Sequence, residues 1–110
     1  MSEPSSARSY WFHPQAEAEF IEEVERLQAD DPQTALAFEH EVFGAIEQLL
    51  RHPESAPVIA ERRGRRIRRK VLLRSRYNLY YFLKDDLIRI YAVAHQRRKP
   101  GYWLSRTKSQ

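Results

Sequence analysis

The sequence predicts an α+β fold in which two amphipathic helices pack on one face of a largely antiparallel sheet. Residues 14–50 carry two apolar stripes at helical spacing, whereas residues 65–95 alternate with a period of two and are rich in β-branched and aromatic side chains. The length of 110 residues is enough for one hydrophobic core. We therefore expect a single domain over residues 1–110, with flexible ends at 1–8 and 107–110. The predicted order is one strand, two helices and three strands.

The first half of the chain predicts a short strand and a helical hairpin. The segment SYWF at residues 9–12 is typical of a strand. The segment DDP at 30–32 separates the two helices, with Asp31 as the N-cap and Pro32 in the first turn of the second helix. Because this connection is very short, the helices should be antiparallel neighbours. Two prolines in RHPESAP (51–57) end the second helix.

The second half predicts three strands at residues 65–73, 76–84 and 87–95. The KDDL junction at 84–87 predicts a tight hairpin between the last two. The middle segment is apolar on both sides, which is typical of a central strand. Alternation divides the last strand into one face with Ile88, Ile90, Ala92 and Ala94, and another with Arg89, Tyr91, Val93 and His95. We expect the first face to contact the helices, since their apolar stripes need a surface to cover.

The charges are unevenly distributed along the chain. Residues 13–48 contain ten acidic side chains and one basic one, whereas residues 61–76 contain nine basic side chains and one acidic one. The net charge is +4. This asymmetry favours an anionic partner on one face, although a solvated sheet face is the simpler explanation of any charge run.

The sheet face away from the helices is the predicted binding surface. The cluster HQRRKPGYW at 95–103 would extend this face at the end of the last strand. The predicted binding residues are Arg66, Arg68, Lys70, Arg89, Tyr91, His95, Arg97 and Arg98.

The composition excludes several classes of site. There is no cysteine, and the four histidines are scattered without a ligand spacing, so we predict no metal site and no cofactor. No apolar stretch approaches the roughly 20 residues that span a bilayer, and the first ten residues lack the apolar core of a signal peptide. We expect a cytoplasmic protein that does not bind membranes.

The element order and the segment RRIRRKVLLRSRYNLYYFLKDDLIRIYAVAHQRRKPGYWLSR (65–106) resemble the RelE/ParE superfamily of toxins from bacterial type II toxin–antitoxin systems. The resemblance covers about residues 10–106 and is most specific in the C-terminal motif. It is closer to the ParE-like, plasmid-stabilisation branch. It implies a small basic toxin that a cognate antitoxin neutralises in a hetero-oligomer.

The resemblance leaves the molecular target open. ParE-like members poison DNA gyrase, and RelE-like members cut mRNA in the ribosome. A basic RNA-binding domain without toxicity is a third alternative.

A nuclease would require a proton-transfer group and cations that hold the phosphate. The candidate catalytic residues are His95 for proton transfer, Arg68 and Arg97 for the phosphate, and Tyr102 for base stacking. Each has a structural explanation as well: His95 as a capping residue at a strand end, Arg97 as an antitoxin contact, and Tyr102 as a cover for the edge of the core. RNA-cutting members of the superfamily often carry lysines or acidic groups in their sites. Here Lys70 is the only lysine of the basic strand and no glutamate accompanies it, so this departure from the resemblance weakens the nuclease alternative.

Overall fold

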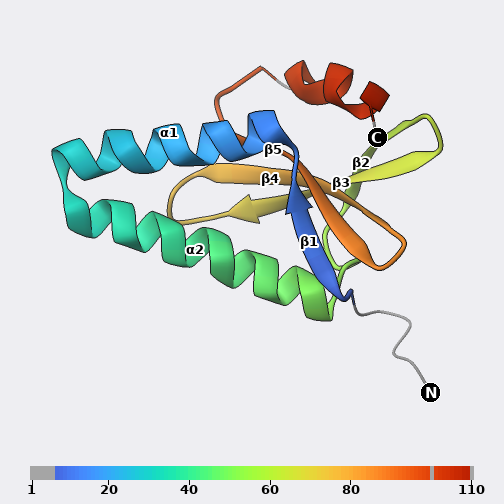
Figure 1. Ribbon diagram of the computed structural model, residues 1–110, viewed down its shortest axis with the longest axis horizontal. Coiled ribbons are helices and arrows are strands. Elements are labelled where there is room, and N and C mark those ends of the chain that lie inside the picture. The colour runs from blue at the N-terminus through green and yellow to red at the C-terminus, as the bar shows by residue number, and fades with distance from the viewer. Residues whose placement is uncertain (1–6, 100, 110) are drawn as a thin grey trace.

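A helical hairpin lies across one face of a five-stranded sheet in the computed structural model, which describes residues 7–99 and 101–109 (Figure 1). The elements are β1 (Ser9–Phe12), α1 (Pro14–Asp30), α2 (Pro32–Arg51), β2 (Val58–Arg62), β3 (Arg65–Leu72), β4 (Tyr77–Lys84), β5 (Leu87–His95) and the 3₁₀ helix η1 (Tyr102–Ser109). The predicted α+β class is confirmed. The short strand β2 and the helix η1 are additions that the sequence patterns did not indicate.

The helix boundaries follow from local capping chemistry. The carboxylate of Asp31 accepts hydrogen bonds from the Gln33 amide at 3.1 Å and the Thr34 hydroxyl at 2.9 Å, so Asp31 caps α2 as predicted. Pro32 follows in the first turn, where its missing N–H costs nothing. At the start of α1, the Nδ1 atom of His13 accepts the Gln15 amide at 3.1 Å. The two helices are therefore separate elements with a sharp turn between them.

The strands are arranged in the order β1-β5-β4-β3-β2, with β4 in the centre as predicted. Strands β2 to β5 are antiparallel, and β1 pairs in parallel with β5. Asp85 and Asp86 both have positive φ angles, 54° and 62°, which is the backbone of a type I′ turn. This turn confirms the hairpin predicted at KDDL.

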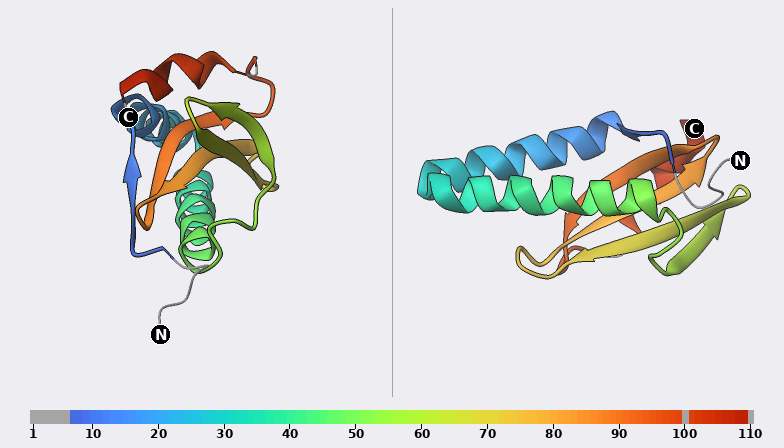
Figure 2. Two further views of the ribbon diagram at one scale, coloured as in Figure 1. Left: turned by 90° about the vertical axis from the view of Figure 1, so that its right-hand side faces the viewer. Right: turned by 90° about the horizontal axis from the view of Figure 1, so that it is seen from below.

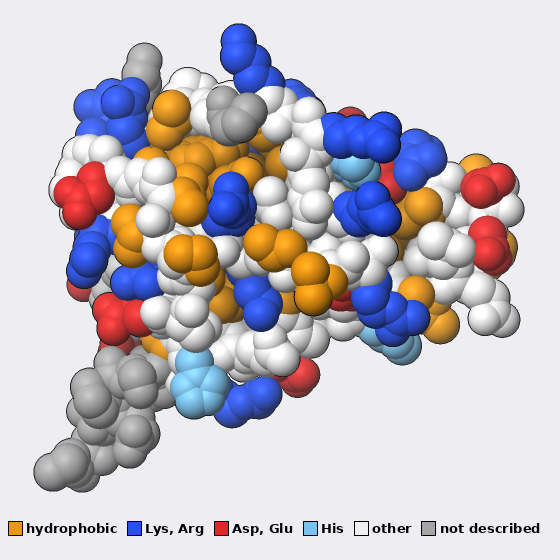
Figure 3. All heavy atoms as spheres, turned by 180° about the vertical axis from the view of Figure 1, so that it is seen from behind, with side chains coloured by type: hydrophobic (Ala, Val, Ile, Leu, Met, Phe, Trp, Pro, Cys, Tyr) orange, Lys and Arg blue, Asp and Glu red, His pale blue; other side chains and the backbone are white. Residues whose placement is uncertain are grey.

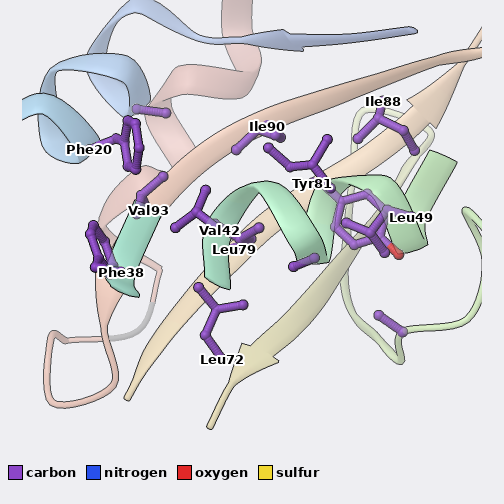
Figure 4. Packing of buried hydrophobic residues seen from close by; sticks show 14 residues of the cluster. Phe20, Phe38, Val42, Leu49, Leu72, Leu79, Tyr81, Ile88, Ile90 and Val93 are labelled. Carbon is purple, nitrogen blue, oxygen red and sulfur yellow. The ribbon is translucent and has the colours of Figure 1, made fainter. Parts of the chain in front are cut away.

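The main core lies between the hairpin and the sheet. Phe38, Val42 and Leu49 of α2 pack with Leu79 and Tyr81 of β4 (Figure 4). The right-hand view of Figure 2 shows the helices and the strands as two layers. Burial of aliphatic and aromatic side chains at this interface is the main stabilising contribution to the fold.

A second cluster lies on the other face of the sheet. It contains Trp103 of η1, stacked on Tyr80 with ring centroids 5.0 Å apart. Thr107 is also buried, and its hydroxyl donates to the carbonyl of Leu104 at 2.8 Å. The prediction of a flexible end at 107–110 is therefore wrong at Thr107. Most of the flexible end predicted at 1–8 lies outside the described residues.

Candidate functional site

The residues predicted to share one basic face lie on both faces of the sheet. Lys70 pairs with Leu79 and Arg68 with Tyr81, and both partners belong to the core under the hairpin. These basic side chains are therefore on the hairpin side of β3. On the other face, the ring of Tyr91 is fully buried. The prediction of a single exposed face is wrong.

A one-residue bulge adds a further difference, within β5 itself. Tyr80 pairs with Ala92, but the next residue, Tyr81, pairs with Ile90, so Tyr91 is an extra residue in its strand. An extra residue reverses which side chains point to each face beyond it. Ile90 and Val93 consequently both pack under the hairpin, while Ala92 belongs to the second cluster. Strict alternation, on which the sequence prediction relied, assigns Ala92 and Val93 to the wrong faces.

The space-filling view shows no continuous basic patch on the back of the described part of the molecule. Figure 3 shows Lys and Arg side chains scattered over the back of the molecule, with hydrophobic side chains exposed between them. Arg89 lies over the ring of Trp11, with its Cζ atom 5.9 Å from the ring centroid. The basic side chains of the strands thus lie at separate places on the surface, each with different neighbours.

His95 lies on the hairpin side of the sheet, at the end of β5. Its ring contacts that of Tyr77 edge-on, with centroids 5.3 Å apart, and its Nδ1 accepts the amide of Arg97 at 3.1 Å. Both rings line a cavity of about 490 Å³ between the hairpin and the β3–β4 turn. Glu23 and Arg26 line the same cavity as an ion pair at 2.6 Å. The hydrogen bond from Arg26 lowers the pKa of Glu23.

Tyr102 and Arg98 form a separate cluster on η1 and the segment before it. The guanidinium carbon of Arg98 is 3.9 Å from the centroid of the Tyr102 ring. The hydroxyl of Tyr102 donates to Glu19 at 2.7 Å, so it is already engaged within the protein. Burial and this hydrogen bond raise the pKa of the Tyr102 hydroxyl. The Tyr102 ring therefore supports the packing of η1.

Glu19 and Arg106 are central to this C-terminal contact, and the sequence analysis did not identify them. The two side chains form a bidentate ion pair at 3.1 and 2.8 Å. Arg106 also donates to the carbonyl of Tyr91 at 2.8 Å, and Glu19 accepts the amide of Val93 at 3.0 Å. Together they satisfy backbone groups of the bulged residue Tyr91 and of Val93, two residues beyond it. We call Glu19, Tyr102 and Arg106 the C-terminal lock.

No local signal in the sequence distinguishes Glu19 from the other glutamates of α1. Five glutamates lie between residues 17 and 25, and only the tertiary structure selects one for burial. Burial alone raises the pKa of Glu19, but hydrogen bonds from Arg106, Tyr102 and Val93 together lower it. The net shift of the Glu19 pKa is downward, so the folded structure stabilises the ionised carboxylate of Glu19 over its protonated form.

The four candidate nuclease residues do not converge on one site. Arg68 is aligned through Tyr81 with Ile90, which is five residues before His95 along β5. Because Tyr91 is an extra residue, the separation along the sheet is that of Tyr81 and Tyr77 on β4, which is four residues or roughly 14 Å at about 3.4 Å per residue. One phosphate cannot contact both side chains across that distance. Arg68 instead donates to the carbonyls of Glu54 and Ala56, at 2.9 and 2.7 Å.

Arg68 belongs to a different group of basic side chains at the β2–β3 turn. A hollow of about 360 Å³ is present there. Its lining residues are Glu54, Arg63, Gly64, Arg65, Arg66, Arg68, Phe82, Leu83 and Lys84. Of the predicted binding residues, only Arg66 and Arg68 are in this group.

Two further tests concern metals and membranes. Within residues 7–99 and 101–109, no three His, Asp or Glu side chains are grouped as ligands of a metal ion would be. None of the helices in the same ranges is long and apolar enough to cross a membrane.

Comparison with known proteins places the chain in a family. The sequence profile of the ParE toxin of the type II toxin–antitoxin system parDE matches residues 10–100. No curated protein sequence matches significantly. A solved structure described as the chromosomal ParDE TA system from P. aeruginosa matches with a TM-score of 0.66 and 18% identity, over 81% of this chain and 96% of that one. At this identity the structural match supports the fold, while the profile covers most of the sequence. The chain therefore belongs to the ParE toxin family of type II toxin–antitoxin systems.

Proposed function

We propose that this ParE-family chain arrests bacterial growth by binding and poisoning DNA gyrase, and that a cognate antitoxin neutralises it. The observation that carries the proposal is the match of residues 10–100 to the profile of the ParE toxin of parDE. The alternative of ribosome-dependent mRNA cleavage needs a proton-transfer group and phosphate-binding cations at one place. Arg68 and His95 are too far apart to serve together, and the Arg98 guanidinium already lies over the Tyr102 ring that would stack a base.

The antitoxin is proposed to cover apolar side chains that this chain leaves exposed. Several lie on the hairpin, and Leu73, beside the β3–β4 turn, is 82% exposed. The exposed large apolar residues on the two helices are Ile21, Leu36 and Phe43. Burying such side chains contributes about 25 cal/mol per Å² of apolar surface, which makes them the main expected source of affinity. The basic strands would add electrostatic attraction to acidic groups of the antitoxin.

One observation keeps mRNA cleavage as a second candidate. The cavity beside His95 also contains Tyr77, Glu23 and Arg26, which are groups able to transfer protons or bind a phosphate. A nuclease site in this cavity would not use Arg68. The mRNA-cleavage candidate requires the cavity to bind RNA, whereas the gyrase candidate does not.

A paired assay separates these candidates. The purified chain is added to DNA gyrase in a supercoiling assay and, in parallel, to translating ribosomes whose mRNA is examined for cleavage. The gyrase proposal predicts loss of supercoiling, with accumulation of cleaved DNA, and intact mRNA. Cleaved mRNA with unaffected supercoiling would replace it with the second candidate. Growth that remains normal when the folded chain is expressed alone would contradict both and favour a non-toxic RNA-binding domain.

A further inference from the structure

The turn end of the β2–β3 hairpin is a two-stranded ribbon with basic side chains on both faces. Arg62 pairs with Arg65 and Glu61 with Arg66, so alternation places Arg62 and Arg65 on one face and Arg66 on the other. Arg63 and Gly64 form the turn, with φ angles of 53° and 77°. We call residues 61–68 the basic ribbon.

The basic ribbon separates from the rest of the sheet. The pairing of β3 with β4 ends at Arg68 and Tyr81, whereas β2 and β3 remain paired as far as Arg62 and Arg65. Strand β4 continues beside β5 to the pair Lys84 and Leu87. The ribbon tip and the β4–β5 turn accordingly point in different directions in Figure 1. The 360 Å³ hollow lies where they separate, since residues of β3 and of the end of β4 line it.

The cations around this hollow have little compensation from acidic groups. Among its lining residues are five cations and one carboxylate, that of Glu54. In the described part of the chain, Glu61 is the one acidic partner in ion-pair contact with any of these cations. It lies 3.8 Å from Arg66, with both side chains more than 60% exposed. An ion pair at that distance and exposure contributes little. The site is therefore suited to an external anion.

Two of the arginines are held in place by the fold. Arg68 donates to the carbonyls of Glu54 and Ala56, and Arg65 donates to the carbonyl of Thr107. The Arg65 guanidinium also lies over the ring of Phe82, at 5.4 Å. Carbonyl partners orient these side chains and leave their positive charge uncompensated. A preoriented cation loses less conformational entropy when it binds an anion.

The shape of the ribbon favours duplex DNA over other anions. The major groove of B-DNA is about 12 Å wide and admits a two-stranded β-ribbon, with phosphates along both walls. Cations on both faces and at the tip of a ribbon match that arrangement. The major groove of A-form RNA is too narrow for side chains to read. An acidic peptide lying along one face would leave the cations of the other face unmatched.

We propose that the basic ribbon binds the phosphate backbone of duplex DNA by entering its major groove. The contacting groups on the ribbon are Arg62, Arg63, Arg65 and Arg66, and Lys84 at the end of β4 adds a fifth cation beside the hollow. None of these contacts reads a base, so the binding is independent of sequence. This inference concerns direct contact with DNA and does not require gyrase to be the target. If gyrase is the target, the ribbon would add contacts to the DNA that the enzyme holds.

The test is fluorescence anisotropy of a labelled 20-base-pair DNA duplex titrated with the full chain at several salt concentrations. Neutralising about five phosphates predicts an affinity that falls roughly 10²- to 10³-fold between 50 and 200 mM salt. The double substitution Arg63→Gln and Arg66→Gln should weaken binding at least about tenfold at 100 mM salt and reduce the magnitude of the log–log salt slope by about 2. Arg63→Lys with Arg66→Lys should retain the slope, because the charge is kept.

The matched control is Arg76→Gln with Arg74→Gln, at the other end of β3. Arg76 has a positive φ of 63°, as Arg63 does, and Arg74 is exposed, as Arg66 is. This pair removes the same charge and should leave DNA binding within about twofold. Equal losses in both pairs would show that only net charge matters and would overturn the proposal.

Two further titrations examine the identity of the anion. A labelled RNA duplex of the same sequence should bind more weakly than DNA and respond less to the ribbon substitutions. A polyglutamate peptide should not compete with DNA at an equal concentration of charges. If the peptide binds as tightly as DNA and loses affinity with the same ribbon substitutions, the ribbon is an acidic-peptide site and the DNA proposal is wrong. If the RNA duplex binds more tightly, it is wrong as well.

Discussion

The C-terminal lock and the basic ribbon both depend on arginine, but they use it in opposite ways. In the lock, Arg106 is 9% exposed and forms a bidentate ion pair with Glu19 across α1 and η1. In the ribbon, Arg66 is 64% exposed and its nearest carboxylate oxygen is 3.8 Å away. One arginine holds the fold together, and the other is available to a partner. A count of basic residues cannot distinguish the two, because burial and partners decide which role each has.

The largest expected effect tests the lock. Arg106→Ala leaves the Glu19 carboxylate, 17% exposed, without its cation, and should reduce the free energy of unfolding by about 3 kcal/mol. Urea unfolding followed by circular dichroism measures this change. In the ribbon, Arg66→Ala should change stability by less than about 0.5 kcal/mol. A similar loss for the two variants would remove the distinction between lock and ribbon.

A smaller effect is expected from the Tyr102 hydroxyl. Tyr102→Phe removes its 2.7 Å hydrogen bond to Glu19 and keeps the ring, so the free energy of unfolding should fall by about 1.5 kcal/mol. Tyr10→Phe is the control, because Tyr10 is an exposed tyrosine on β1. Its effect should be within about 0.5 kcal/mol. If Tyr102→Phe is as neutral as the control, the hydroxyl is not part of the lock.

The lock also predicts a dependence of stability on pH. The pKa of Glu19 is lower in the folded state, so its contribution is fully present above about pH 4.5 and is lost as the pH falls through the folded-state pKa. The chain should therefore lose stability in acid, and Glu19→Gln should show a weaker dependence below pH 4.5. Burial lowers the pKa of His13, whose protonation costs stability in a separate range below about pH 6.5. Parallel curves for wild type and Glu19→Gln in the acid range would contradict the assignment.

The smallest effect is expected for His95. His95→Gln should leave growth arrest nearly unchanged, because a gyrase-binding toxin needs no proton transfer from this ring. A general base contributes typically 10²- to 10⁴-fold to a rate, so a nuclease would lose nearly all activity. The measurement is growth arrest at matched expression, with folding checked by circular dichroism. Arg97→Glu with Arg98→Glu should reduce arrest much more, since it reverses local charge. A well-folded but harmless His95→Gln variant would favour the endonuclease.

The sequence predicted the elements better than it predicted the site. The capping residue Asp31, the KDDL turn and the central position of β4 are local or compositional features, and the structure confirms each of them. The strand β2 was missed because its sequence, VIAER, is short and has little alternation. In residues 65–73, Ile67 belongs to the second cluster, Leu72 packs under the hairpin and Leu73 is exposed.

The family and the fold class could be predicted from sequence alone, because helix caps, apolar periodicity and the C-terminal motif each depend only on residues that are close together in the chain. The site was decided by the tertiary structure. One extra residue at Tyr91 reverses the faces of β5 beyond it, and a register shift of this kind has no local signature in a strand that is apolar on both sides. Likewise, Glu19 is one of five similar glutamates until Arg106, 87 residues away in the chain, meets it. The role of each charged side chain depends on which distant residue the fold places beside it. A local sequence pattern does not show which distant residue that will be.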